Sequence, residues 1–177
     1  CDPVSWEVLD DLDEAWIHPK EFFMTSQERF EQALESIEDE LQLRLTEFDM
    51  QNKFIERHRL EQRTQYDLEM LREIGHCQAI ENYSLHFDGR QPGERPYCLL
   101  DFFAACARQF HGDPKKFLVI MDESHVTLPQ VGGMYFGDKS RKDSLIEHGF
   151  RLPTAADNRP LKMPEFQHLV PQMVYVS

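Results

Sequence analysis

One short stretch of this sequence carries the residue types that nucleotide hydrolysis needs. An unbroken apolar run, Phe117 to Met121, leads directly into Asp122-Glu123-Ser124-His125. Such runs are typical of strands buried on both faces of a parallel sheet, and ligands of these sheets bind at the carboxyl ends of the strands. The pattern is that of a Walker B motif in its DExH form. The plainer interpretation is a surface turn that ends a strand with two solvated acids.

The nucleotide-site interpretation gives each polar side chain a role and requires ATP and Mg²⁺ as cofactors. Asp122 would hold Mg²⁺ through a coordinated water, because Mg²⁺ keeps several waters and takes few protein carboxylates. Glu123 would orient or deprotonate the water that attacks the γ-phosphate. His125 would bind near the nucleotide and couple the site to the opposing domain or to nucleic acid.

The loop that cradles phosphates is missing from these residues. No GxxxxGK[ST] pattern occurs in the chain, so the backbone amides and the lysine that hold β- and γ-phosphates are absent. We therefore expect no ATP hydrolysis by this chain alone. Cys1 stands in place of an initiator Met, and the apolar run at 173–176 ends the chain. Both features lead us to expect a fragment whose phosphate loop lies upstream.

A second set of residues could bind single-stranded nucleic acid. Between residues 139 and 162, six bases stand against three acids, and aromatic side chains lie nearby at Tyr135, Phe136 and Phe150. Phosphate contacts combined with base stacking are how proteins hold single strands. The alternative is an ordinary solvated helix face with aromatic residues in the core. The six bases are Lys139, Arg141, Lys142, Arg151, Arg159 and Lys162.

The four cysteines form no CxxC pair. A zinc site drawn from His76, Cys77, Cys98, Cys106 or His111 matches no standard ligand spacing. We expect reduced thiols that are buried or inert.

Two helices joined by a turn at 49–52 are expected to form a hairpin over residues 26–74. The first helix begins with Thr25 as its cap and Glu28 as the capping-box partner. An acidic face, from Glu31 to Glu40, lies opposite its apolar stripe. The second helix ends at Gly75. The first apolar stripe is Phe30, Ala33, Leu34, Ile37, Leu41, Leu45 and Phe48, and the second is Phe54, Leu60, Leu68, Leu71 and Ile74.

The net charge of −13 is concentrated at one end of the chain. Residues 1–50 hold 15 acids and 3 bases, whereas residues 76–177 hold 12 acids and 11 bases. Whole-chain acidity therefore does not exclude a nucleic-acid partner for the second half. No apolar run approaches membrane-spanning length and the N-terminus has no signal-peptide pattern, so we expect a cytoplasmic protein with no membrane contact.

Several longer motifs resemble those of the UvrB family, the damage-verifying, helicase-like ATPase subunits of bacterial nucleotide excision repair. The resemblance covers essentially the whole chain. It rests on the runs Arg59 to Leu71, Gly75 to Ser84, Asp122 to Gln130, Gly132 to Tyr135, Gly149 to Pro153 and Asp157 to Leu161.

The resemblance implies an α/β fold. We expect part of a RecA-like parallel sheet, of the P-loop NTPase and superfamily-2 helicase type, with strands at 117–121 and 173–177 and a long helical hairpin. Residues 1–24 would be the tail of a UvrA-binding insertion, and residues 25–177 the later half of the first helicase-like domain. The implied partners are damaged, partly single-stranded DNA and the UvrA and UvrC subunits.

Site roles follow only where residues match the family's motifs. Asp122 and Glu123 match its Mg²⁺ and hydrolysis carboxylates. This chain departs from the family pattern at two places. Within residues 76–85 it lacks a Gly and an Arg of that pattern, and around residues 104–115 it has a segment that the pattern does not contain. Four more residues match positions near the family's DNA path: Arg63, Glu81, Phe150 and Arg151.

An alternative of a different class remains open. The chain could be a non-enzymatic helical-hairpin module for protein interaction in which Asp122-Glu123-Ser124-His125 is incidental.

Overall fold

A computed structural model of the chain describes residues 26–177, in which two long antiparallel helices, α1 (Gln27–Met50) and α2 (Phe54–Ile74), form the predicted hairpin. The stripe of α1 is confirmed, because its apolar residues from Ala33 to Phe48 are buried and Phe30 packs against them. On α2, Leu60, Leu68 and Leu71 are buried as predicted. Phe54 and Ile74 are exposed, so their assignment to the core was wrong. They are the first and last residues of α2.

The ends of the hairpin helices follow local capping rules. Ser26 caps α1, with its hydroxyl 3.4 Å from the Arg29 N–H. The prediction of Thr25 as the cap was wrong by one residue. Gly75 ends α2 in the left-handed conformation at φ 71°, as predicted. The predicted strand-like lead-in over residues 1–24 lies outside the described residues.

The chain after the hairpin folds into short elements around two longer helices. They are η1 (Ile80–Tyr83), α3 (Ser84–Asp88), α4 (Leu99–His111), β1 (Val119–Met121), α5 (Ser124–Glu147), η2 (Pro153–Asp157), α6 (Met163–Leu169) and β2 (Met173–Tyr175).

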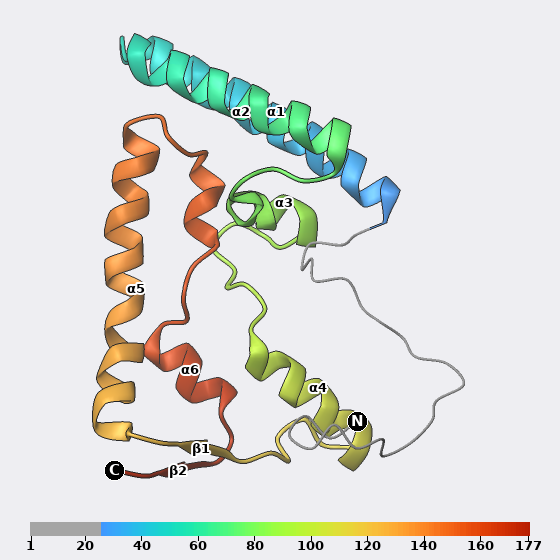
Figure 1. The fold of residues 1–177 in the computed structure, drawn as a ribbon, viewed down its shortest axis with the longest axis vertical. Helices are drawn as coiled ribbons and strands as arrows, with labels where there is room; N and C mark the ends of the chain where they lie inside the picture. Colours follow the sequence, from blue (N-terminus) through green and yellow to red (C-terminus); the bar gives the residue numbers. More distant parts are fainter. Residues whose placement is uncertain (1–25) are drawn as a thin grey trace, which may run out of the picture.

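The long helix α5 connects the two ends of this part of the molecule. In Figure 1 it runs from the strands up to the hairpin, and α6 and α4 lie to the right of its lower half. Its sequence contains Pro129 and three glycines, which disfavour helix, so the sequence did not predict it. None of the helices between residues 26 and 177 is long and apolar enough to span a membrane.

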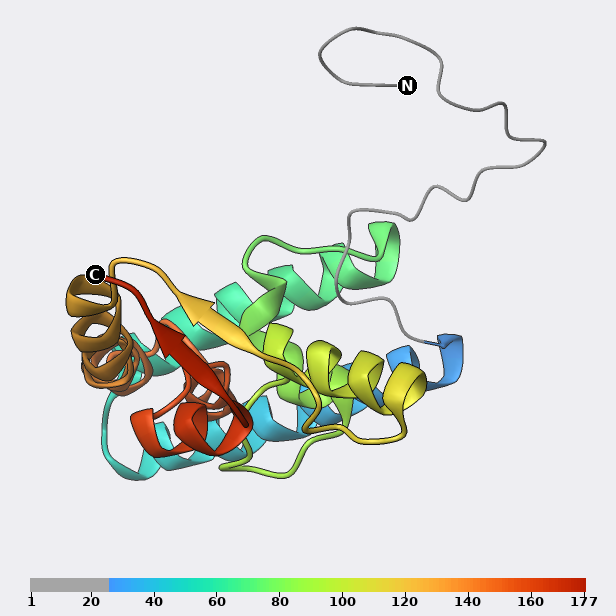
Figure 2. The same cartoon turned by 90° about the horizontal axis from the view of Figure 1, so that it is seen from below.

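The two strands pair in parallel, with Val119 opposite Met173 and Met121 opposite Tyr175 (Figure 2). This confirms a parallel pair near both predicted positions, although each strand has three residues. The expectation that the first strand is buried on both faces was wrong for the described residues. Ile120 is 65% exposed, and Met121 is the one buried residue of the three. Apolar composition alone therefore overestimated burial.

Gly149 joins the C-terminal end of α5 to the hairpin. It has φ 71°, and a Cβ there would lie 2.2 Å from the backbone oxygen of Glu56 on α2. Backbone atoms cannot move aside as a flexible side chain can. This position thus requires glycine both for its conformation and for the close approach of α2.

We expect Gly149→Ala to lower the free energy of unfolding by roughly 2–4 kcal/mol, combining left-handed strain with overpacking. The matched control is Gly133→Ala within α5, where nothing lies within 4 Å of the added Cβ. It should be neutral or gain up to about 1 kcal/mol through helix propensity. Urea unfolding of both variants measures the difference, and equal stabilities would contradict the close approach.

Candidate nucleotide and nucleic-acid sites

The Asp122-Glu123 turn directly follows β1 and begins α5. Glu123 adopts the left-handed conformation, with φ 47° and ψ 44°, which costs a non-glycine residue about 1–2 kcal/mol. The Glu123 N–H donates to Asp122 Oδ1 at 2.9 Å, and the Thr127 hydroxyl donates to the Asp122 carbonyl at 3.1 Å. These bonds hold the turn while both carboxylates stay exposed.

The end of β2 completes this turn. The Ser124 N–H donates to the Val176 carbonyl at 2.9 Å. His125 Nδ1 lies 2.9 Å from the Ser177 hydroxyl and 3.5 Å from Glu123 Oε2. The carboxyl ends of both parallel strands therefore meet at the acidic turn, which is where parallel sheets place ligands.

The donor set fits a hydrated Mg²⁺ ion and not an ion caged by protein. Among residues 26–177, no cluster of three or more His, Cys, Asp or Glu side chains could hold a metal. Mg²⁺ is commonly held by one or two carboxylates together with waters and substrate phosphates. Asp122 could supply one such carboxylate.

The cysteines of residues 26–177 likewise belong to no such group. Cys77 is fully buried, and burial, helped by nearby Asp67, raises the pKa of its thiol to about 12. It is therefore an inert thiol, as predicted. Cys106 is exposed, and Cys1 lies outside the described residues.

A polar cleft of about 410 Å³ lies between α5, η1 and the segment that follows η2. Four bases and two acids line it, together with Asn82 and Asn158. It brings Glu81 and Arg151 together, two residues that the sequence assigned to nucleic-acid binding. The charged lining residues are Glu81, Asp138, Arg141, Lys142, Arg151 and Arg159.

An adjoining cleft of about 370 Å³ combines arginines with aromatic rings. The Arg59 guanidinium carbon lies 4.2 Å from the centroid of the Phe150 ring, and Arg59 also donates to the His148 carbonyl at 2.7 Å. Phe150 is 43% exposed and Tyr66 54% exposed. The cleft is lined by Arg59, Gln62, Arg63, Tyr66, Phe150 and Arg151.

Arg151 lines both clefts. Its guanidinium donates to the Phe150 carbonyl at 2.9 Å, and it has no ion pair with a carboxylate in the described part of the chain. Arg63, by contrast, pairs with Asp67 at 3.1 Å and donates to the Gln78 carbonyl at 3.3 Å. Among the described residues, Arg151 and Arg59 are therefore the cleft arginines without a carboxylate partner, and of these only Arg151 lines both clefts.

Fewer bases of the stretch 139–162 are free to contact a nucleic acid than its composition suggests. Lys142 is buried, donating to the Asn158 carbonyl and pairing with Asp138. Arg141 also pairs with Asp138, and the remaining pairs are Lys139–Asp143 and Arg159–Glu165.

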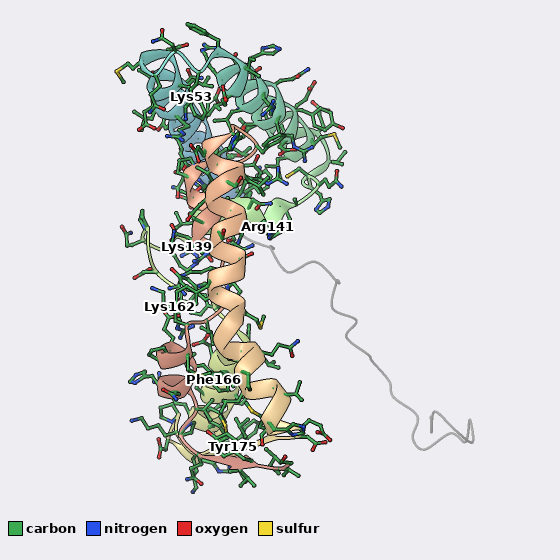
Figure 3. All side chains as sticks on the ribbon, turned by 90° about the vertical axis from the view of Figure 1, so that its left-hand side faces the viewer. Lys53, Lys139, Arg141, Lys162, Phe166 and Tyr175 are labelled. Carbon is green, nitrogen blue, oxygen red and sulfur yellow. The ribbon has the colours of Figure 1, made fainter. Side chains whose placement is uncertain are left out.

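Tyr135 lines neither cleft, although it contacts Arg159 of the polar cleft. Lys162 Nζ lies 4.9 Å from its ring centroid and Arg159 lies 5.5 Å from it. Figure 3 shows Lys139 and Arg141 on the half of α5 nearer the hairpin, whereas Tyr175 lies at the sheet end.

Sequence reasoning missed three residues that the structure makes prominent. Arg59 and Tyr66 line the aromatic cleft, and their helical spacing relative to Arg63 was a usable signal. Arg90 is buried, and its side chain donates to Asp88, Glu94, Asp157 and Ser84. It sits in a Gly- and Pro-rich loop, where no pattern indicates burial.

Comparisons with known proteins identify related sequences. Residues 28–89 match the family model described as the UvrB third helical domain. The chain is 52% identical over 176 residues to UvrABC system protein B of Chlorobium phaeobacteroides (strain BS1), covering 99% of this chain and 24% of that protein. The same protein from Cyanothece sp. (strain PCC 7425) is 54% identical over 99% of the chain, and that from Methanothermobacter thermautotrophicus 53% over 98%. The chain spans about a quarter of the length of these curated relatives.

Two arginine–carboxylate pairs predict a pH dependence of stability. The hydrogen bond from Arg95 lowers the pKa of Asp101 from 3.8 to about 2, and that from Arg159 lowers the pKa of Glu165 from 4.5 to about 2. A carboxyl group whose pKa is lower in the folded protein than in the unfolded chain stabilises the fold. This contribution is fully present at pH values above the unfolded-state pKa, and it is lost as the pH falls through the folded-state pKa.

The free energy of unfolding should therefore fall as the pH drops from about 4.5 to 2. Glu165→Gln should reduce the slope of the free energy of unfolding against pH in this range. Glu69→Gln, on the exposed face of α2, is the control and should leave that slope unchanged. Urea titrations at several pH values measure it, and an unchanged slope in Glu165→Gln would contradict the assigned pair.

Proposed function

This chain matches the UvrB family along nearly its whole length, and we propose that it forms part of a DNA-damage recognition and verification subunit of nucleotide excision repair. The observation that carries the proposal is the convergence of Arg63, Phe150 and Arg151 on one cleft. These residues come from distant parts of the sequence and belong to motifs that resemble the family. The relatives are named as protein B of the UvrABC system, so UvrA and UvrC are the proposed protein partners.

The two clefts are suited to a damaged, partly single-stranded DNA. The exposed rings of Tyr66 and Phe150 offer stacking surfaces, and Arg59 and Arg151 offer charge beside them. Stacking combined with guanidinium groups binds single strands with little dependence on sequence. Glu81 and Asn82 in the adjoining cleft supply an acceptor and an amide that could contact base edges or sugars. Tyr135, flanked by two bases, would make a more peripheral contact.

We further propose that Asp122 and Glu123 form half of an ATP site. Mg²⁺, when bound, would neutralise charge on the phosphates. Asp122 would bind a water of its hydration shell, Glu123 would orient the attacking water, and His125 would contact the nucleotide side. The exposed carboxylates at the carboxyl end of β1 support these roles. The phosphate cradle would come from residues other than these 177.

The domain assignment belongs to the same proposal. Residues 1–24 would be the tail of a UvrA-binding insertion, and residues 25–177 the later half of a RecA-like first helicase domain. The parallel pair β1–β2 and the acidic turn at its end support a RecA-like sheet. The alternative of a hairpin interaction module is less well supported, because the similarity extends over 98–99% of the chain and not over the hairpin alone.

We expect Arg151→Ala to weaken binding of a fluorescein-labelled single-stranded oligodeoxynucleotide by about five- to tenfold and to reduce the salt slope by about 1. The matched control is Arg72→Ala, which removes an arginine of α2 that pairs with Glu38 at 2.9 Å, outside both clefts. Fluorescence anisotropy across salt concentrations measures both. Equal affinities for the two variants would contradict a DNA site at Arg151.

We expect Asp122→Asn or Glu123→Gln, in the protein at its full length, to lower DNA-stimulated ATP hydrolysis by about 10²-fold or more while leaving DNA affinity unchanged. Asp113→Asn is the control, since Asp113 is an exposed carboxylate that accepts the Lys115 N–H in the loop before β1. A steady-state phosphate-release assay reports the rates. Undiminished turnover in either variant would rule out its assigned role.

A further inference from the structure

A hydrogen-bond network fastens η2 to the hairpin. Thr154 donates to Glu40 twice, from its backbone N–H to Oε1 at 2.9 Å and from its hydroxyl to Oε2 at 2.7 Å. His86 Nε2 lies 2.9 Å from the same Oε2, and His86 Nδ1 lies 2.9 Å from the Ser36 hydroxyl. The His86 side chain is 4% exposed and that of Glu40 15%. Bonds to an ionised group in a site largely closed to water are strong, so they hold Thr154 firmly against α1.

The other end of η2 is held independently. Arg90 donates to the Asp157 carbonyl at 3.1 Å, and the Gly93 N–H donates to Asp157 Oδ1 at 2.9 Å. Between these two anchors, Ala155 is buried. The segment Pro153–Asp157 is thus fixed at both ends.

Both flanks of this fixed segment carry an arginine of the polar cleft. Arg151 stands three residues before Thr154, and Arg159 stands two residues after Asp157. Both line the 410 Å³ cleft. Arg151 has no carboxylate partner in the described part of the chain, so its position depends on the backbone that carries it.

We propose that Glu40, acting through Thr154, is a positioning residue for Arg151 and thereby for the polar cleft. The hairpin then also has a positioning role, because the Glu40 carboxylate of α1 helps to set the geometry of a cleft that other elements form. The effect on DNA affinity rests on the proposed function of that cleft, whereas the effect on the backbone at Thr154 does not.

The neighbouring acid Glu38 provides a matched control. It lies on the same helix two residues away, and it pairs with Arg72 of α2 at 2.9 Å. It therefore makes a hairpin contact that does not reach η2. A general loss of hairpin stability would follow from either substitution, whereas of these two acids only Glu40 contacts η2.

The experiment compares Glu40→Ala, Glu40→Gln and Glu38→Ala in the protein at its full length. We expect amide exchange over residues 150–159 to accelerate about tenfold in Glu40→Ala, less in Glu40→Gln, and not in Glu38→Ala. Affinity for the labelled single-stranded oligodeoxynucleotide should fall about three- to tenfold in Glu40→Ala. It should fall no further in the double variant Glu40→Ala/Arg151→Ala than in Arg151→Ala alone, because both changes act on one contact.

Two results would overturn the proposal. One is unchanged exchange over 150–159 in Glu40→Ala, and the other is an affinity loss that simply adds to that of Arg151→Ala. If Arg151→Ala alone leaves affinity unchanged, the proposed DNA site fails, and the exchange data then decide the positioning role by themselves. Should Glu40→Ala not fold, Thr154→Val and Thr154→Ser provide the same comparison, with the hydroxyl removed in the first and retained in the second.

Discussion

The buried guanidinium of Arg90 is the interaction on which the arrangement of the clefts most depends. It lies where the chain leaves α3, and its side chain donates to groups from three segments, at Ser84, Glu94 and Asp157. A buried charge is tolerated only when its donors are satisfied, and replacing a partner would leave it costly. Because two of the four acceptors of this side chain are backbone oxygens, those of Glu94 and Asp157, the loop and η2 can close around Arg90 in few ways. The position of the cleft-lining residues beyond η2 follows from that closure.

The acidic turn and the clefts lie at opposite ends of one helix. α5 begins at Ser124 beside the turn and ends at Glu147, two residues before Gly149 meets the backbone of α2. Asp138, the α5 residue of the polar cleft nearest to the turn, lies 14 residues beyond Ser124, or about 21 Å along the helix. Any influence between a nucleotide and DNA would therefore pass through α5, or through the segment between β2 and η2. Within α5, Pro129 and the glycines are the positions at which the helix would bend most readily.

Sequence patterns predicted what depends on local periodicity and little of what depends on contacts distant in sequence. The hairpin, its buried stripe and the stop at Gly75 follow from helical spacing and capping. Glu40 shows the limit, since the pattern put it on the solvated acidic face, whereas Thr154 and His86 enclose it. Residues brought together by folding, such as Arg59 with Phe150, share no local signal. Arg63, Phe150 and Arg151 were found through motif resemblance, which carries tertiary information that periodicity does not.

The distribution of charge explains how an acidic chain could still offer a surface for an anionic polymer. The acids of α1 from Glu31 to Asp39 face solvent, while Glu40, the next acid along, is enclosed by the network at η2. Most bases of the 139–162 stretch are paired with carboxylates, so its net charge overstates the local attraction. Of the six bases, Arg151 and Lys162 have no ion pair among the described residues, and Arg151 lies between the two clefts with aromatic surface beside it. With the Debye length about 10 Å at 0.1 M salt, the solvated acids of α1 beyond that distance would be screened from a strand bound at Arg151. Local geometry, and not the total of −13, would then decide what this face of the protein binds.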